Sequence, residues 1–146
     1  VFKVVQEAQY RRLEAIKHPL WVRAMAAQIN SKKTKFFRWH DSGDVQSLKH
    51  LLKIFKVARL TPEVAHWLPT REAWTQAYQD RAPSNLVIRF SMPMVNQPAA
   101  GNWRNTSTVV TEEKKATCPA TKQDNSCRDC RACWSPSVKN VAYLAH

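Results

Sequence analysis

The sequence predicts an α/β fold in which helices precede a short parallel sheet and a cysteine-rich segment follows it. Three observations predict it. Apolar residues recur at helical spacing near the N-terminus, short aromatic and β-branched runs then alternate with helical runs, and all four cysteines lie at or after Cys118. A chain of 146 residues with 44% hydrophobic residues is enough for one domain, which we divide into residues 1–34, 35–110 and 111–146.

Residues 1–29 predict two helices that are separated by Pro19. Each carries an apolar stripe at helical spacing, made of Val4, Val5, Ala8 and Ile16 in the first and of Trp21, Val22, Met25 and Ile29 in the second. Because such stripes pack inward in most proteins, we expect both helices to face the core.

Residues 35–110 predict alternating strands and helices. The four expected strands are Lys35–His40, a run ending at Pro69, Leu86–Phe90 and Thr106–Val110. The helices between them are expected over Val45–Arg59 and from Thr70 to about Asp80, the first with Leu48, Leu51, Leu52, Phe55 and Ala58 on its buried face. Strands separated by helices imply right-handed βαβ crossovers and therefore a parallel sheet.

Charge and composition restrict the partners. The 23 Lys and Arg outnumber the 11 Asp and Glu and give a net charge of +12. This excess favours an anionic partner such as nucleic acid, although a solvated basic face is the simpler interpretation.

Two glycines are too few for a phosphate-binding glycine loop, and we expect no membrane-spanning helix. The chain begins at Val1 rather than Met, which leaves open whether further residues precede it.

The cysteines follow the pattern Cys118-x8-Cys127-x2-Cys130-x2-Cys133. A triplet at this spacing plus one distant thiol is typical of a [4Fe-4S] cluster, whereas structural zinc usually takes two separate Cys-x2-Cys pairs. Zn²⁺ is therefore the alternative, and disulfides are the third interpretation. We expect Arg128 and Arg131 to offset thiolate charge and Trp134 to shield the metal from solvent.

A second polar group stands where the expected strands end. His40, Asp41 and Asp44 follow the first strand, and Arg71 follows the second. Because the carboxyl ends of parallel strands share one edge of the sheet, we expect these residues to meet there and to form the surroundings of the cluster. The simpler interpretation is that Ser42 or Asp44 caps a helix and that Arg71 pairs with an Asp.

Several motifs together resemble the bacteriophage gene product eighty-eight family. They are RWHDSGD, ARLTPEV, WLPTRE, NLVIRFS, TSTVV, TCPA, CRDCRACW and the terminal VAYLAH, and they cover about Lys35 to His146. The resemblance implies a phage origin, hence the cytoplasm of an infected host cell, and a metal cluster. It implies no particular reaction.

The strand motifs are also similar to half of the TIM-type barrel of radical S-adenosylmethionine enzymes. Those enzymes hold their cluster with Cys-x3-Cys-x2-Cys after an early strand, whereas here four cysteines near the C-terminus suffice to close a cluster.

The hypothesis from the sequence is a basic [4Fe-4S] protein that transfers electrons or contacts nucleic acid, with an acidic host redox protein as another partner. The alternatives are a radical-SAM-like or other iron-sulfur enzyme and a zinc-stapled accessory protein. Neither enzymatic activity nor oligomeric state follows from the residues.

Overall fold

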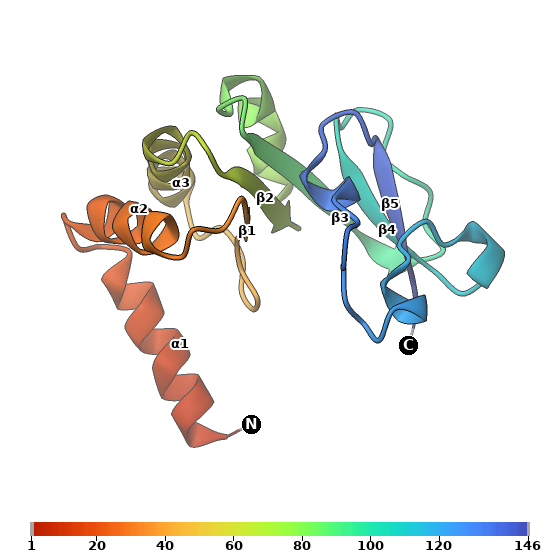
Figure 1. Cartoon of the computed structure of the whole chain (residues 1–146), viewed down its shortest axis with the longest axis horizontal. Coiled ribbons are helices and arrows are strands. Elements are labelled where there is room, and N and C mark those ends of the chain that lie inside the picture. The colour runs from red at the N-terminus through yellow and green to blue at the C-terminus, as the bar shows by residue number, and fades with distance from the viewer. Residues whose placement is uncertain (1, 146) are drawn as a thin grey trace.

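A computed structural model describes residues 2–145 and contains a parallel sheet of five strands in the order β1-β2-β3-β4-β5. The strands are β1 (Phe36–Arg38), β2 (Ala65–Thr70), β3 (Leu86–Val95), β4 (Thr106–Val110) and β5 (Asn140–Leu144). Each strand pairs with the next one in the sequence, as in a TIM barrel, and the sheet curls into a half-barrel (Figure 1). The expected α/β class is confirmed.

Three α-helices and four 3₁₀ helices accompany the sheet. They are α1 (Lys3–Ala15), α2 (Trp21–Ser31), α3 (Leu48–Leu60), η1 (Ala73–Arg81), η2 (Glu113–Lys115), η3 (Ala120–Lys122) and η4 (Ala132–Trp134). The expected helix after Thr70 is thus a 3₁₀ helix. None of the helices described here is long and apolar enough to cross a membrane.

Helix α3 begins later than the sequence predicted. The side chain of Ser47 caps it by accepting a hydrogen bond from His50 N at 3.2 Å. The expectation of Ser42 or Asp44 as the cap was wrong, because Asp44 binds elsewhere, as described below.

The main core lies between α2, α3 and one face of the sheet. Leu51, Ile54 and Phe55 of α3 are almost completely buried in the same cluster as Leu68 of β2 and Ile88 of β3. Each such side chain stabilises the fold by about 1.5–3 kcal/mol.

Not every expected core residue is in this core. Leu48 and Leu52, which were expected to be buried, are 39% and 42% exposed because the packed stripe of α3 is centred on other positions.

The stripe on α1 was also expected in the core, and this expectation was wrong. No residue of α1 is buried, and Val4 and Val5 are 71% and 49% exposed. Figure 1 shows α1 extending away from the sheet. At its C-terminal end, Lys53 of α3 donates hydrogen bonds to the carbonyl groups of Ile16 and His18.

The second half of the sheet differs most from the expectation. β3 continues beyond Phe90 to Val95, and its pairing with β4 is irregular between Ser91 and Val95, where Pro93 cannot donate a hydrogen bond. The crossovers from β3 to β4 and from β4 to β5 contain no α-helix. β5 was not predicted, and the cysteine-rich segment is the connection that leads into it.

Candidate functional site

The cysteine-rich segment covers the face of the sheet opposite to α2 and α3. Successive strand residues point to opposite faces, so Leu68 faces the helices while Trp67 faces the cysteine segment. Trp134 fixes this arrangement: its indole N–H donates to Phe37 O at 3.0 Å, and its ring centroid lies 5.3 Å from that of Trp67. The segment is therefore part of the tertiary structure and not a loose tail.

All four cysteines line one small pocket on this face, together with Pro119, Ala120, Ala132, Trp134 and Val141. Cys133 is buried, Cys118 and Cys130 are half-buried and Cys127 is exposed, and none forms a disulfide. In residues 2–145, no three His, Cys, Asp or Glu side chains converge on a position for a single metal ion. The structure brings the four expected thiols to one place without arranging them around one point.

A buried arginine ties this segment to the sheet. Arg89 of β3 is 0% exposed, and its guanidinium donates to backbone carbonyl oxygens at 2.7–3.3 Å, those of Thr106, Ala132, Ser135 and Val138. No ion pair among the described residues includes Arg89. Burial lowers the pKa of Arg89, and the neighbouring Cys133 opposes that shift. The sequence signal for this residue was a charged side chain inside the apolar strand LVIRF.

Tyr143 of β5 contacts the buried cysteine. Its hydroxyl lies 3.2 Å from Cys133 Sγ. Burial raises the pKa of Tyr143, and the adjacent Cys133 raises it further. Burial also raises the pKa of Cys133, while the hydrogen bond from Tyr143 and the charge of Arg89 lower it. The tyrosine is consequently a neutral hydrogen-bond donor for any charge on this sulfur.

A cleft of about 470 Å³ lies at the carboxyl ends of the strands. It contains the four residues expected at the strand ends, which are His40, Asp41, Asp44 and Arg71. The hydroxyl groups of Ser91, Ser107 and Thr108 and the guanidinium of Arg38 also line it. Tyr143 lines the same cleft. This residue therefore belongs both to the cleft and to the surroundings of Cys133.

Asp44 joins the ends of β1 and β2. Its carboxylate accepts hydrogen bonds from Thr70 Oγ1 at 2.7 Å and from the backbone N–H groups of Arg71 and Val45 at 2.6 Å. The expected ion pair of Arg71 with an Asp does not form among the described residues, because the Asp44 carboxylate binds the backbone N–H of Arg71 and not its guanidinium. Asp41 makes an exposed ion pair with Arg38 at 3.8 Å.

His40 has an unusual environment. Its φ of 53° lies in the left-handed region, and its Nδ1 is buried without a hydrogen-bond partner among the described residues. Burial lowers its pKa. His40 lines both the carboxyl-end cleft and a second cavity, and a strained residue with an unpaired polar atom is typical of functional sites.

The two arginines between the cysteines, Arg128 and Arg131, contact nearby side chains and backbone groups. Arg128 pairs with Asp124 at 2.8 Å, and Arg131 donates to Cys130 O at 2.7 Å while its guanidinium stacks over Phe36 at 4.7 Å. Sequence reasoning named these two and missed Arg89, which is the buried cation beside the pocket.

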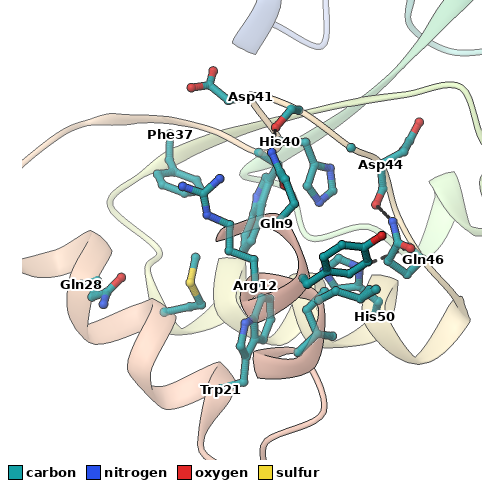
Figure 2. Close-up of a pocket in the computed structure, with 17 residues that line it drawn as sticks. Gln9, Arg12, Trp21, Gln28, Phe37, His40, Asp41, Asp44, Gln46 and His50 are labelled. Carbon is teal, nitrogen blue, oxygen red and sulfur yellow. Dashed lines mark hydrogen bonds between the residues drawn. The ribbon is translucent and has the colours of Figure 1, made fainter. Parts of the chain in front are cut away.

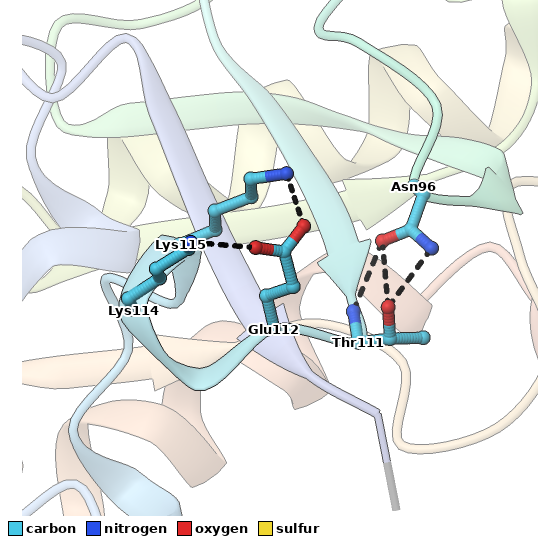
Figure 3. A network of polar contacts seen from close by, with 5 residues as sticks. All are labelled: Asn96, Thr111, Glu112, Lys114 and Lys115. Atoms are coloured by element: carbon cyan, nitrogen blue, oxygen red, sulfur yellow. Dashed lines mark hydrogen bonds and ion pairs between the residues drawn. The ribbon is translucent and has the colours of Figure 1, made fainter.

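The start of the cysteine-rich segment is held by a polar network (Figure 3). Asn96, which follows β3, accepts a hydrogen bond from Thr111 N at 3.0 Å. Glu112 pairs with Lys115 and with Lys114, and these lysines lower the pKa of its carboxyl group. The network joins the ends of β3 and β4 where the segment begins.

Comparison with known proteins gives one match. A model of the family described as gene product 88 matches residues 1–136. The match begins before Lys35, where the sequence resemblance was expected to start, and it ends before β5. No curated protein and no solved structure matches the chain, so the similarity to radical S-adenosylmethionine enzymes is not supported.

Proposed function

This chain belongs to the gene product 88 family, and we propose that it is a phage iron-sulfur protein that works in the cytoplasm of the host cell. Cys118, Cys127, Cys130 and Cys133 would hold a [4Fe-4S] cluster against the concave face of the half-barrel, next to the carboxyl-end cleft.

The observation that carries this proposal is the buried cation beside the four thiols. A buried charge without an ionic partner is costly, and Arg89 has only neutral carbonyl groups as hydrogen-bond acceptors. A cluster with four thiolate ligands is anionic, so it would compensate the charge of Arg89. Neutral thiols leave that charge unbalanced.

The donor set fits iron and sulfide. Four thiolates are soft ligands, and a triplet at x2, x2 spacing wraps three corners of a cubane while Cys118 supplies the fourth. All four thiols line one pocket, which supports a site that they share. When bound, such a cluster accepts or gives one electron.

The residues of the chain would direct this chemistry toward the cleft. Tyr143 keeps its proton and would donate a hydrogen bond to the Cys133 sulfur, while its ring forms part of the cleft wall. Arg38 and Arg71 share the cleft with the carboxylates of Asp41 and Asp44, and Asp41 pairs with Arg38, while the hydroxyl groups of Ser91 and Thr108 add hydrogen-bond donors. The cleft thus suits a small polar substrate.

A second function, contact with nucleic acid, is favoured by the surface charge. Residues 1–40 contain nine basic and two acidic side chains, and all nine basic residues are exposed. Within the described residues only Lys17 and Arg38 of these nine are in ion pairs. Such a surface binds phosphates without reading sequence.

Anaerobic purification with iron, acid-labile sulfide and zinc analysis tests the proposal. We expect four irons and four sulfides per chain, a brown protein, and an electron paramagnetic resonance signal after reduction. A colourless protein with one zinc per chain would establish the stapled accessory protein instead, and a metal-free protein after anaerobic reconstitution would contradict both.

A further inference from the structure

A cavity of about 580 Å³ lies apart from the cysteine site. It lies between α1, α2 and the loop that follows β1 (Figure 2). The loop residues 40–44 separate it from the carboxyl-end cleft, because they line both. Its volume is in the range of pockets that take a small organic ligand.

Aromatic side chains form the inner wall. Trp21 and Trp39 have ring centroids 6.2 Å apart with an angle of 32° between their planes, and Phe37 packs edge-on against Trp39 at 5.0 Å. All three line the cavity. Tyr10 of α1 also lines it and is 65% exposed, so its ring is available at the entrance. Flat apolar walls of this kind favour a planar ring.

Two neutral histidines supply polar edges. His50 is 3% exposed, and its Nδ1 accepts a hydrogen bond from Gln46 N at 3.2 Å. Nδ1 is therefore the acceptor of the neutral ring, and Nε2 carries the proton. No side-chain hydrogen bond found in residues 2–145 uses Nε2 of His50. His40, whose ring centroid is 5.6 Å from that of His50, has the buried, unpaired Nδ1 described above.

Burial supports this assignment of protons. It lowers the pKa of His50 to about 4 and also lowers that of His40. One ring thus offers an N–H donor, and the other holds a nitrogen that lacks a partner. Paired donor and acceptor groups beside aromatic rings are what the edge of a nucleobase needs.

The outer wall carries charged side chains of both signs, Arg12 from α1 and the carboxylates of Asp41 and Asp44 from the loop, and the Asp44 carboxylate is engaged in hydrogen bonds with Thr70 and Arg71. Arg12 lines the cavity from α1 and makes no ion pair among the described residues. Gln9, one helical turn earlier, donates a hydrogen bond to Ser42 Oγ and so holds α1 against the loop. Figure 2 shows Gln9 close to His40 and Arg12 on the same side of the cavity. A guanidinium here suits a phosphate group at the cavity mouth.

We propose that this cavity binds a nucleotide, with the base against Trp21 and Trp39, its polar edge at His40 and His50, and the phosphate at Arg12. The site is independent of the cysteine pocket. The nucleotide is either free or part of a single strand, since both present the same base and phosphate.

Calorimetric titration of the full chain with AMP, adenosine and ribose phosphate tests the proposal. We expect saturable binding of AMP, weaker binding of adenosine, and no measurable binding of ribose phosphate. Arg12→Ala should weaken AMP about tenfold and leave adenosine unchanged, because it removes one charge-assisted contact. The matched control is Arg11→Ala, which removes the same charge from the same helix at a residue that does not line the cavity. It should change the affinities for AMP and for adenosine by no more than about twofold.

Histidine ring resonances give a second measurement. AMP should shift the signals of His40 and His50 and leave those of His18 and His66 in place. Competition with a short single strand distinguishes the sources: displacement of AMP indicates a nucleotide within a strand, and its absence indicates a free nucleotide. The proposal is wrong if AMP gives no saturable heat, or if Arg11→Ala and Arg12→Ala weaken it equally.

Discussion

The hydroxyl group of Tyr143 lies 3.2 Å from the sulfur of Cys133, and the same tyrosine lines the cleft at the carboxyl ends of the strands. This contact connects the cysteine pocket with the cleft at the carboxyl ends of the strands. It places a neutral donor next to the buried cysteine, where it would influence electron density on a ligated sulfur.

Tyr143→Phe is expected to keep the cluster and to lower its reduction potential. Removing a hydrogen bond to a thiolate ligand makes the extra negative charge of the reduced cluster less favourable. A redox titration monitored by electron paramagnetic resonance measures the change. Tyr10→Phe, on the exposed helix α1, is the control and should leave the potential unchanged. Equal potentials for wild type and Tyr143→Phe would show that the hydroxyl does not act on the cluster.

Arg89→Met is expected to destabilise the cluster-free protein, because four buried carbonyl groups lose their donor at a cost of roughly 1–3 kcal/mol each, and this loss exceeds the relief from removing an unbalanced buried charge. Urea unfolding gives this free energy. The control is Arg128→Met, which removes an exposed arginine of the cysteine-rich segment and should change the stability by less than about 0.5 kcal/mol. Similar values for both variants would contradict the role of Arg89 as the anchor of the cysteine segment.

Cys118→Ala is expected to lose most of its iron and sulfide, since no other cysteine of the chain is left to complete four thiolate ligands. The same result is expected for Cys127, Cys130 and Cys133. Ser126→Ala, beside the ligands, controls for loop disturbance and should retain the cluster. A full cubane in Cys118→Ala would show that a different group supplies the fourth ligand.

The cluster-free protein is expected to become less stable as the pH is lowered, and His66 contributes to this loss. This buried ring accepts a hydrogen bond from Trp39 Nε1 at 3.2 Å and contacts Thr61 Oγ1 at 2.7 Å, and burial lowers its pKa to about 4. The unfolded chain, with a histidine pKa near 6.5, binds the proton first. The contribution of His66 to the free energy of unfolding is therefore fully present above about pH 6.5, and it decreases by up to about 3 kcal/mol as the pH falls toward 4.

Melting temperatures between pH 7 and pH 4 measure this loss. His66→Gln should remove only part of the pH dependence, because burial also lowers the pKa of His50 to about 4, whereas His18→Gln, an exposed site, should preserve it in full. An unchanged slope in His66→Gln would assign the acid sensitivity to other groups.

Nucleic-acid binding, if the basic surface serves it, is expected to be electrostatic. Affinity for a short duplex should fall steeply as salt increases from 50 to 200 mM, with little dependence on sequence. Replacing Lys32, Lys33 and Lys35 together by Gln should reduce the slope of log affinity against log salt by up to about 3. Fluorescence anisotropy measures both. No retention of DNA or RNA by the wild type at the lowest salt would contradict this function.

The sequence by itself determined the elements in which local pattern and burial agree. Thr106–Val110 is a strand at the predicted boundaries, and Pro19 separates two helices as expected. It also determined that Cys127, Cys130 and Cys133 would lie together, because they are too close in sequence to separate, whereas the fold brings Cys118 to the same pocket. Residues at strand ends were predicted to meet because parallel strands place their carboxyl ends at one edge.

Only the tertiary structure decided which surfaces are covered. An apolar stripe shows that α1 is a helix but not that a partner lies against it, so Val4 and Val5 are exposed. β5 is short, and its pairing with β4 depends on a connection of nearly thirty residues that local pattern does not describe. The sequence analysis gave Arg89 no role, since a sequence does not record that a guanidinium is buried. The contact between Tyr143 and Cys133 likewise arises because the cysteine-rich segment crosses the face of the sheet opposite to α2 and α3, and only the assembled sheet brings β5 under that segment.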